Sequence, residues 1–223
     1  SGLARIARDL SLRLAAHAED LGIRFAQVGI DFPSGWHWQP WDFYGFQPET
    51  GGDQGRRAVS VVVAELQAQT GQEPIILAIT DPNRLYDLTR TQMDGIEDVE
   101  IETERIWGYL PIDGHDLHGR IGGPGALAVD TCERVLGYGR YGAGVLLETL
   151  RYLDQDTKPV PFLPHGIDLQ VFHPAQQKYD DAFGRWRSAL RTDALIIGCV
   201  ATNQPRKDYG LLFGAVAAIK AKG

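Results

Sequence analysis

The chain has 223 residues, of which 43% are hydrophobic and 23% are charged, and its formal net charge is −7. This length suffices for one complete core and part of a second. The negative charge argues against a general nucleic-acid surface, because phosphate binding needs a basic face. No apolar run reaches the roughly 18–20 residues that cross a bilayer, so we expect a cytoplasmic protein, with membrane association open but not indicated.

Strand-like and helix-like segments alternate along the chain, which favours an α/β fold with a parallel sheet covered by helices. The spacing of apolar residues predicts which segments are helices and which are strands. Helices are expected over residues 3–18, 58–70, 141–152, 180–191 and 211–220. Strands are expected over residues 23–29, 74–79, 105–110, 134–138, 160–163 and 195–200.

The two ends of the chain and one polar stretch set the expected domains. A glycine turn, Ser1-Gly2, opens the first helix, and in an α/β protein such a turn normally follows a strand. We therefore interpret the chain as a fragment truncated at both ends. Between about Pro174 and Asp193 the apolar strand pattern lapses into polar residues. This predicts a first domain over residues 1–178, lacking its first strand, and a linker with the start of a second domain over residues 179–223.

Two later segments carry the most specific motifs. Residues 164–168 read PHGID, in which we expect Gly166 to take a backbone angle closed to other residues and Asp168 to accept local backbone hydrogen bonds. Arg206 and Lys207 follow the expected strand 195–200, at the carboxyl edge where open α/β sheets bind ligands. An arginine fork beside a lysine suits a diphosphate.

Together these segments resemble the interdomain hinge and the start of the second domain in GT-B glycosyltransferases, especially the retaining enzymes often called family four. The resemblance implies two Rossmann-like domains facing across a cleft, with the acceptor on the first and a nucleotide-sugar donor on the second. It assigns the hinge to His165, Gly166 and Asp168, and the donor diphosphate to Arg206 and Lys207. In the family the two cations are often several residues apart, whereas here they are adjacent.

The resemblance also implies further properties. The helix start at Gly2 matches the family's glycine-rich loop near the donor phosphates, and a helix amino terminus favours an anion. The partners would be the nucleotide-sugar donor and a carbohydrate or other hydroxyl acceptor, with no cofactor and no metal. The family's glutamate pair would lie beyond Gly223, so we expect the 223-residue chain alone to bind donor poorly and to turn over little or nothing.

A polar loop after the expected strand 105–110 is a candidate for chemistry. Asp113 and His115 lie within it, at the carboxyl edge of the sheet, where either could hydrogen-bond a sugar hydroxyl or assist proton transfer. Aspartate and histidine at alternating positions could also bind a divalent metal. A solvated polar loop without a ligand is the third interpretation.

Residues 36–46 are rich in aromatic side chains, among them Trp36, Trp38 and Trp41. Such side chains can stack on the apolar faces of sugars, which would make these three tryptophans acceptor-binding residues. The alternative is a loop or hairpin that packs against itself and seals the first domain.

Other functions are less well supported. Residues 137–142 read GYGRYG and match the dinucleotide fingerprint, but that fingerprint normally marks the first strand–helix unit and is followed by an acidic ribose ligand that is missing here. A dehydrogenase is therefore a weak alternative. A GT-B epimerase or phosphorylase, and a non-catalytic carbohydrate-binding protein on the same fold, are the closer rivals.

Overall fold

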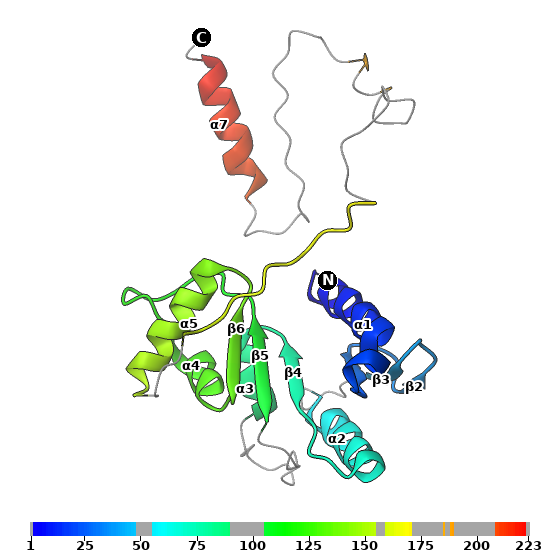
Figure 1. The fold of residues 1–223 in the computed structure, drawn as a ribbon. Coiled ribbons are helices and arrows are strands. Elements are labelled where there is room, and N and C mark those ends of the chain that lie inside the picture. The colour runs from blue at the N-terminus through cyan, green and yellow to red at the C-terminus, as the bar shows by residue number, and fades with distance from the viewer. Residues whose placement is uncertain are drawn as a thin grey trace. The chain divides into compact units, whose positions relative to one another are not determined.

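The computed structural model describes residues 2–47, 55–89, 105–154, 159–170, 185, 188–189 and 208–221. The chain divides into two compact units, Ser1–Gly166 and Ile167–Gly223 (Figure 1). The described part contains helices and parallel strands, which confirms the predicted α/β class. The predicted boundary at residue 178 lies outside the described residues and stays a prediction.

The first half of the larger unit builds a small mixed sheet. It comprises helix α1 (Gly2–Leu21), strands β1 (Ala26–Ile30), β2 (Gly35–His37) and β3 (Asp42–Phe46), and helix α2 (Arg56–Thr70). The strand order is β1-β3-β2, with β1 parallel and β2 antiparallel to β3. Helix α2 packs on β1 and β3. It ends at Gly71, whose positive φ of 67° and N–H bond to the Gln67 carbonyl (2.8 Å) close the last turn.

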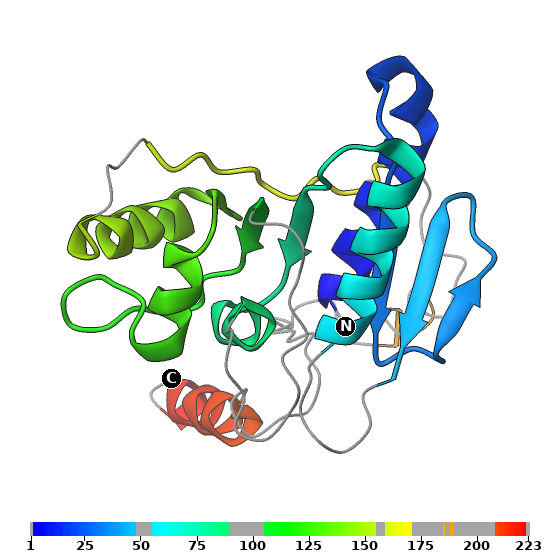
Figure 2. The ribbon, with the colours of Figure 1, turned by 90° about the horizontal axis from the view of Figure 1, so that it is seen from below.

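The second half of the unit builds a parallel sheet. Its elements are β4 (Ile76–Ile79), α3 (Pro82–Thr89), β5 (Ile106–Leu110), α4 (Gly123–Asp130), β6 (Arg134–Gly137) and α5 (Arg140–Tyr152). The strands run in the order β4-β5-β6 (Figure 1), and Figure 2 shows the same elements from below. The predicted strand at 160–163 extends this sheet at one position, where Phe162 pairs in parallel with Gly137. The Gly137 N–H donates to the Pro161 carbonyl at 3.0 Å, and the Leu163 N–H donates to the Gly137 carbonyl at 2.9 Å.

The core of the unit lies between the parallel sheet and helices α3, α4 and α5. Three leucines from different elements, Leu85, Leu110 and Leu146, are fully buried there. Fully burying a leucine contributes about 1.5–3 kcal/mol. Because Leu110 is the last residue of β5, this core holds in place the strand end from which the polar loop begins.

The second unit is described mainly by helix α7 (Tyr209–Ala221), which confirms the helix predicted over 211–220. Its first turn is capped by Asp208, whose Oδ1 accepts a hydrogen bond from the Leu211 N–H at 3.0 Å. The predicted strand 195–200 lies outside the described residues, as does most of the predicted helix 180–191. Of the helices in the described ranges, none is long and apolar enough to cross a membrane.

Two short helices were not predicted, and each carries a proline in its first turn. Pro82 is the first residue of α3, where its missing N–H costs nothing. The carboxylate of Asp81 caps this helix by accepting a hydrogen bond from the Asn83 N–H at 2.9 Å. Helix α4 likewise carries a proline, Pro124, in its first turn.

Gly137 is expected to tolerate no side chain. A Cβ atom there would lie 2.5 Å from the backbone nitrogen of Ala143 and 3.0 Å from its Cα, and neither atom can move without shifting helix α5. We expect Gly137→Ala to lower the free energy of unfolding by about 1–3 kcal/mol.

The matched control for this prediction is Gly144→Ala, in the same helix. A Cβ at Gly144 meets nothing within 4 Å, so alanine should stabilise the helix by up to about 1 kcal/mol. Urea denaturation followed by the amide signals of β6 measures both variants. Equal effects of the two substitutions would contradict the close approach of β6 to α5.

Candidate functional site

Three rings meet where the strands of the parallel sheet end. Tyr109 is the penultimate residue of β5, Tyr138 follows β6 directly, and His165 follows the segment that pairs with Gly137. They lie together because parallel strands bring their carboxyl ends to the same edge of a sheet. We call these three residues the edge cluster.

The edge cluster is tightly packed. The ring centroids of Tyr109 and Tyr138 are 4.4 Å apart, and those of Tyr138 and His165 are 4.0 Å apart. Tyr109 is buried and its hydroxyl donates a hydrogen bond to the Leu163 carbonyl at 2.5 Å. This bond links β5 to the segment that leads to His165, and it holds the buried ring of Tyr109 in place.

The two phenols differ in how their hydroxyls are used. Burial raises the pKa of Tyr109, and burial together with the neighbouring Tyr109 raises the pKa of Tyr138 to about 12. Both are therefore neutral at physiological pH and able to donate a hydrogen bond. The Tyr138 hydroxyl is buried and has no hydrogen-bond partner among the described residues. A buried donor without a partner costs free energy, so the hydrogen-bonding capacity of this hydroxyl is unused among the described residues.

His165 is expected to titrate below its ordinary range. Partial burial lowers its pKa from 6.5, because the desolvated charged form is disfavoured. The neutral ring therefore predominates at pH 7. In the folded state the His165 ring becomes protonated only when the pH falls below the pKa of an unperturbed histidine. A titration of the His165 ring signals by NMR measures the pKa.

The Tyr138→Ala variant gives the comparison for this titration. Removing the ring that lies 4.0 Å from His165 admits water, so the pKa of His165 should move back toward 6.5. An unchanged pKa in the variant would show that Tyr138 does not cover the imidazole.

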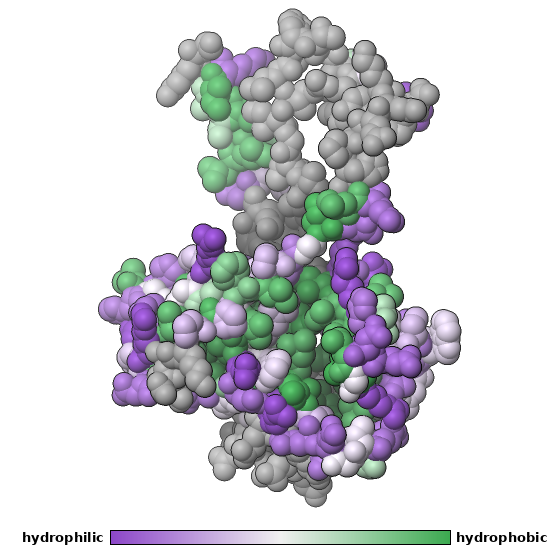
Figure 3. All heavy atoms as spheres, viewed as in Figure 1, coloured by the Kyte–Doolittle hydropathy of each residue, from purple (hydrophilic) through white to green (hydrophobic). Residues whose placement is uncertain are grey.

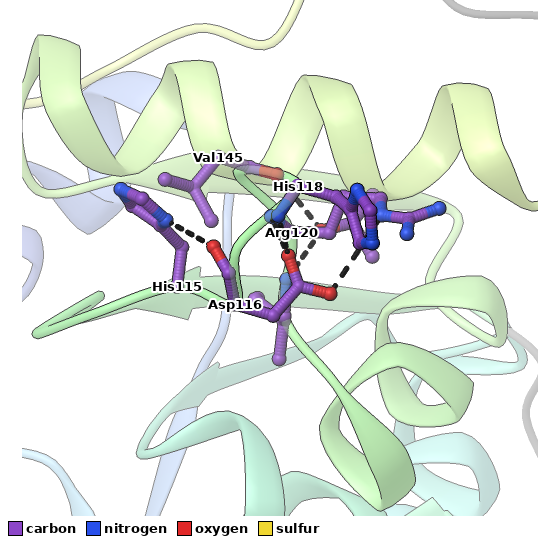
Figure 4. Close-up of polar contacts among 7 residues, drawn as sticks. His115, Asp116, His118, Arg120 and Val145 are labelled. Carbon is purple, nitrogen blue, oxygen red and sulfur yellow. Dashed lines mark hydrogen bonds and ion pairs between the residues drawn. The ribbon is translucent and has the colours of Figure 1, made fainter.

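The polar loop after β5 is held by Asp116 (Figure 4). Its Oδ1 accepts hydrogen bonds from the backbone N–H groups of His118 (2.8 Å) and Arg120 (3.0 Å), and its own N–H donates to the Arg120 carbonyl at 2.8 Å. The backbone bond from Arg120 is the main reason that the pKa of Asp116 is lowered. Asp116 is therefore committed to the shape of the loop.

His115 presents one ring nitrogen outward from this loop. Its Nδ1 lies 2.6 Å from the Asp116 carbonyl, which can only accept, so Nδ1 carries the proton of the neutral ring and Nε2 is left as an acceptor. In Figure 4 the other ring nitrogen points away from Asp116. The His115 ring lies 5.9 Å from that of Tyr141, in the first turn of α5.

Asp113, the other predicted catalytic residue, is exposed. It makes no hydrogen bond or ion pair that the described part of the chain records. Between the two candidates, the geometry therefore provides an oriented base at His115 and a solvated carboxylate at Asp113.

The three predicted acceptor-binding tryptophans differ in exposure and contacts. Trp36 is half exposed and its ring lies 5.2 Å from that of Tyr44, whereas Trp38 is 89% exposed. The Trp41 Nε1 donates a hydrogen bond to Gln27 Oε1 at 3.0 Å, so this side chain is held against β1. The segment contains a hairpin of β2 and β3, as the alternative interpretation of a self-packed hairpin expects. Of the three tryptophans, Trp38 has by far the most exposed side chain.

The remaining predicted residues have different outcomes. The expected left-handed backbone at Gly166 is wrong: its φ is not positive, and a Cβ there would meet nothing within 4 Å. The turn expected at Asp168 is confirmed, because its Oδ1 accepts a hydrogen bond from the Gln170 N–H at 2.8 Å. Gly2 opens helix α1 as expected. Arg206 and Lys207 lie outside the described residues.

The fingerprint-like residues 137–142 have a packing explanation. Gly137 approaches the backbone of α5, as described above, and a Cβ on Gly142 would lie 3.3 Å from Cγ1 of Ile112. These glycines therefore bring strand, helix and loop together, a role that requires no dinucleotide.

Sequence reasoning missed Tyr109 and Tyr138. A signal for both existed, because each stands within one residue of the carboxyl end of a predicted strand, at the ligand-binding edge of an open sheet. None of the family models, curated proteins or solved structures compared with the chain matches it.

Proposed function

We propose that the chain is part of a retaining glycosyltransferase of the GT-B type, in which the unit Ser1–Gly166 receives the acceptor and the following polypeptide holds a nucleotide-diphosphate sugar. One observation carries the proposal. The segment that resembles the interdomain hinge runs parallel beside β6 and ends with His165 on Tyr138, at the carboxyl edge of a parallel sheet. That edge is where open α/β sheets bind ligands.

The chemistry of the edge cluster suits a neutral, hydroxyl-rich ligand. The buried Tyr138 O–H is a donor without a partner among the described residues, the neutral His165 ring both donates and accepts, and the three rings supply apolar faces. No carboxylate or cation belongs to the cluster itself. A sugar combines hydroxyl groups with apolar faces, so it fits this combination better than an anionic ligand does.

In the proposed reaction the acceptor oxygen attacks the anomeric carbon of the donor. The bond from that carbon to the diphosphate oxygen breaks with its electron pair, and the new glycosidic bond forms on the same face. The acceptor proton passes to Nε2 of His115 or to the departing phosphate. Arg206 and Lys207 neutralise the charge that develops on the diphosphate.

Ligand-observed NMR tests the acceptor half of this proposal. Saturation transfer from the 223-residue chain to a panel of neutral mono- and disaccharides is expected to identify at least one that binds. Tyr138→Phe keeps the ring and removes the hydroxyl, and it should weaken this binding by about tenfold. Tyr152→Phe, at the far end of α5 and under the Arg120 guanidinium, is the matched control and should change nothing.

Three results would contradict the proposal. They are the absence of saturation transfer to every sugar, equal effects of the two tyrosine variants, and binding of a nicotinamide dinucleotide at residues 137–142. The last would favour a dehydrogenase.

The exposure of Trp38 favours a second candidate, a carbohydrate-binding protein without transferase activity. An exposed indole on a hairpin can stack on a sugar without any catalytic group. Sugar binding that is lost in Trp38→Ala and kept in Tyr138→Phe, with no affinity for nucleoside diphosphates, would support this candidate over the transferase.

A further inference from the structure

Helix α2 begins at the carboxyl edge of the first sheet. Strands β1 and β3 run parallel and end at Ile30 and Phe46, which are partners in the ladder. A Cβ atom on Gly55, the N-cap of α2, would lie 3.0 Å from Cδ1 of Ile30 and 3.7 Å from Cδ1 of Phe46. The amino terminus of α2 therefore lies at the edge where open α/β sheets bind ligands.

The first turn of α2 is electrostatically unfavourable. It contains two cations, Arg56 and Arg57, and no acidic residue. The amino terminus of a helix is itself positive, because its first N–H groups have no acceptor within the helix, and acidic side chains are the ones that stabilise it. The N-cap residue Gly55 has no side chain that could accept from those N–H groups. A bound anion would satisfy the N–H groups and balance the cations.

The burial of Arg56 is a second, independent indication of an anion. The residue is 7% exposed, and its Nε is buried without a hydrogen-bond partner among the described residues. Asp31 follows β1 at the same edge, but it is exposed and forms no ion pair with Arg56. A buried charge is normally paired, because taking an isolated ion out of water is costly. Arg56 therefore lacks a counter-charge in the described part of the chain.

Helix geometry gives the direction of the Arg56 side chain. In an α-helix each Cα–Cβ bond tilts toward the amino terminus, so the first residue projects its side chain beyond the first turn. Arg56 also lies on the buried face of α2, together with Val63. Arg57 is exposed, and Figure 3 shows mainly hydrophilic residues where Figure 1 places α2. Of the two cations, Arg56 is thus the one directed toward the strand ends.

We propose that the amino terminus of α2 is a binding site for the phosphate group of a small molecule. The Arg56 guanidinium supplies a fork of N–H donors that matches two phosphate oxygens, and the backbone N–H groups of the first turn supply further donors. Because Arg56 is buried, the ligand is a small phosphate ester rather than the surface of a bilayer. The site is separate from the edge cluster, and the proposal does not depend on the glycosyltransferase function.

Titration of the 223-residue chain with inorganic phosphate and with glycerol 3-phosphate, at constant ionic strength, tests the proposal. The NMR signals of the Arg56 Nε–H and of the backbone N–H groups in the first turn of α2 should shift and saturate with both ligands, whereas chloride should leave them in place. Arg56→Met removes the cation and keeps an unbranched side chain, and it should weaken the binding of both ligands by at least about tenfold.

Arg140→Met is the matched control. Arg140 is the first residue of α5, where it also follows a glycine N-cap, but it is exposed. The control variant should therefore bind both ligands as the parent chain does.

Urea denaturation separates a binding role of Arg56 from a structural one. Without phosphate, Arg56→Met should leave the denaturation midpoint equal or higher, because the substitution removes a buried charge that has no counter-charge. Phosphate should raise the midpoint of the parent chain by mass action and leave that of the variant unchanged.

Three outcomes would overturn the proposal. A lower midpoint of Arg56→Met in the absence of phosphate would show that the arginine already has a structural partner. Shifts that do not saturate, or equal losses of affinity in the two arginine variants, would show that phosphate responds only to diffuse surface charge. Binding to phosphatidic acid vesicles that requires Arg56, without binding of either soluble ligand, would contradict a small phosphate ester.

Discussion

Replacing Leu110 by alanine is expected to lower the stability of the unit Ser1–Gly166 by about 2–5 kcal/mol. Leu110 has no exposed surface and packs in the core that also contains Leu85 and Leu146. The loss combines the transfer free energy of the deleted methyl groups with the cavity that they leave. Because Leu110 is the last residue of β5, the variant should also loosen the start of the polar loop.

Leu117→Ala provides a control of the same chemistry seven positions along the chain. Leu117 is 101% exposed, so its substitution should stay within about 0.5 kcal/mol of the parent chain. Urea denaturation followed by the amide signals of β5 isolates the larger unit from the rest of the chain. Comparable effects of the two variants would contradict the described core.

Replacing Arg206 and Lys207 together by alanine is expected to weaken the binding of a nucleoside diphosphate by at least about tenfold. The reason is that hydrogen bonds to charged groups contribute about 1.5–3 kcal/mol each. This prediction rests on the sequence, because both residues lie outside the described ranges. Isothermal titration calorimetry measures it, and the weakening should shrink as added salt screens the charges.

Lys220→Ala is the control for this pair, because it removes a cation from the last turn of α7 and leaves the predicted diphosphate site intact. Unaltered affinity in the double variant, or an equal loss in the control, would remove Arg206 and Lys207 from the donor site. Either result would leave the acceptor half of the proposal to be judged by the sugar-binding experiment alone.

The elements that could be predicted were those with a clear apolar period. Helices α1 and α5 and strand β5 show it, and their observed bounds differ from the predicted ones by at most three residues. Helices α3 and α4 are each only eight residues long, too short for an apolar period to be recognised. Strand β3 pairs in parallel with β1 on the side opposite to β2. This contact was not predicted, because residues 36–46 were interpreted from their aromatic side chains alone.

The candidate site was less predictable because its contacts join distant parts of the chain. His165 and the loop at His115 could be selected from the sequence as neighbours of strand ends. The hydrogen bond from Tyr109 to Leu163, however, links residues 54 positions apart, and the unpartnered hydroxyl of Tyr138 follows from the packing around it. The glycine at 166 was assigned to a strained turn from its residue type alone, and its environment is open.

The burial of Cys132 allows the opening of the parallel sheet to be measured by the rate at which this thiol is labelled. Its Sγ donates to the Ala128 carbonyl at 3.3 Å, and burial raises the pKa of the thiol to about 12. Only the thiolate is alkylated, so the raised pKa leaves this thiol almost unreactive at pH 8 while the fold is closed. With Cys199 replaced by serine, the rate of labelling by iodoacetamide should therefore record how often α4 and β6 separate.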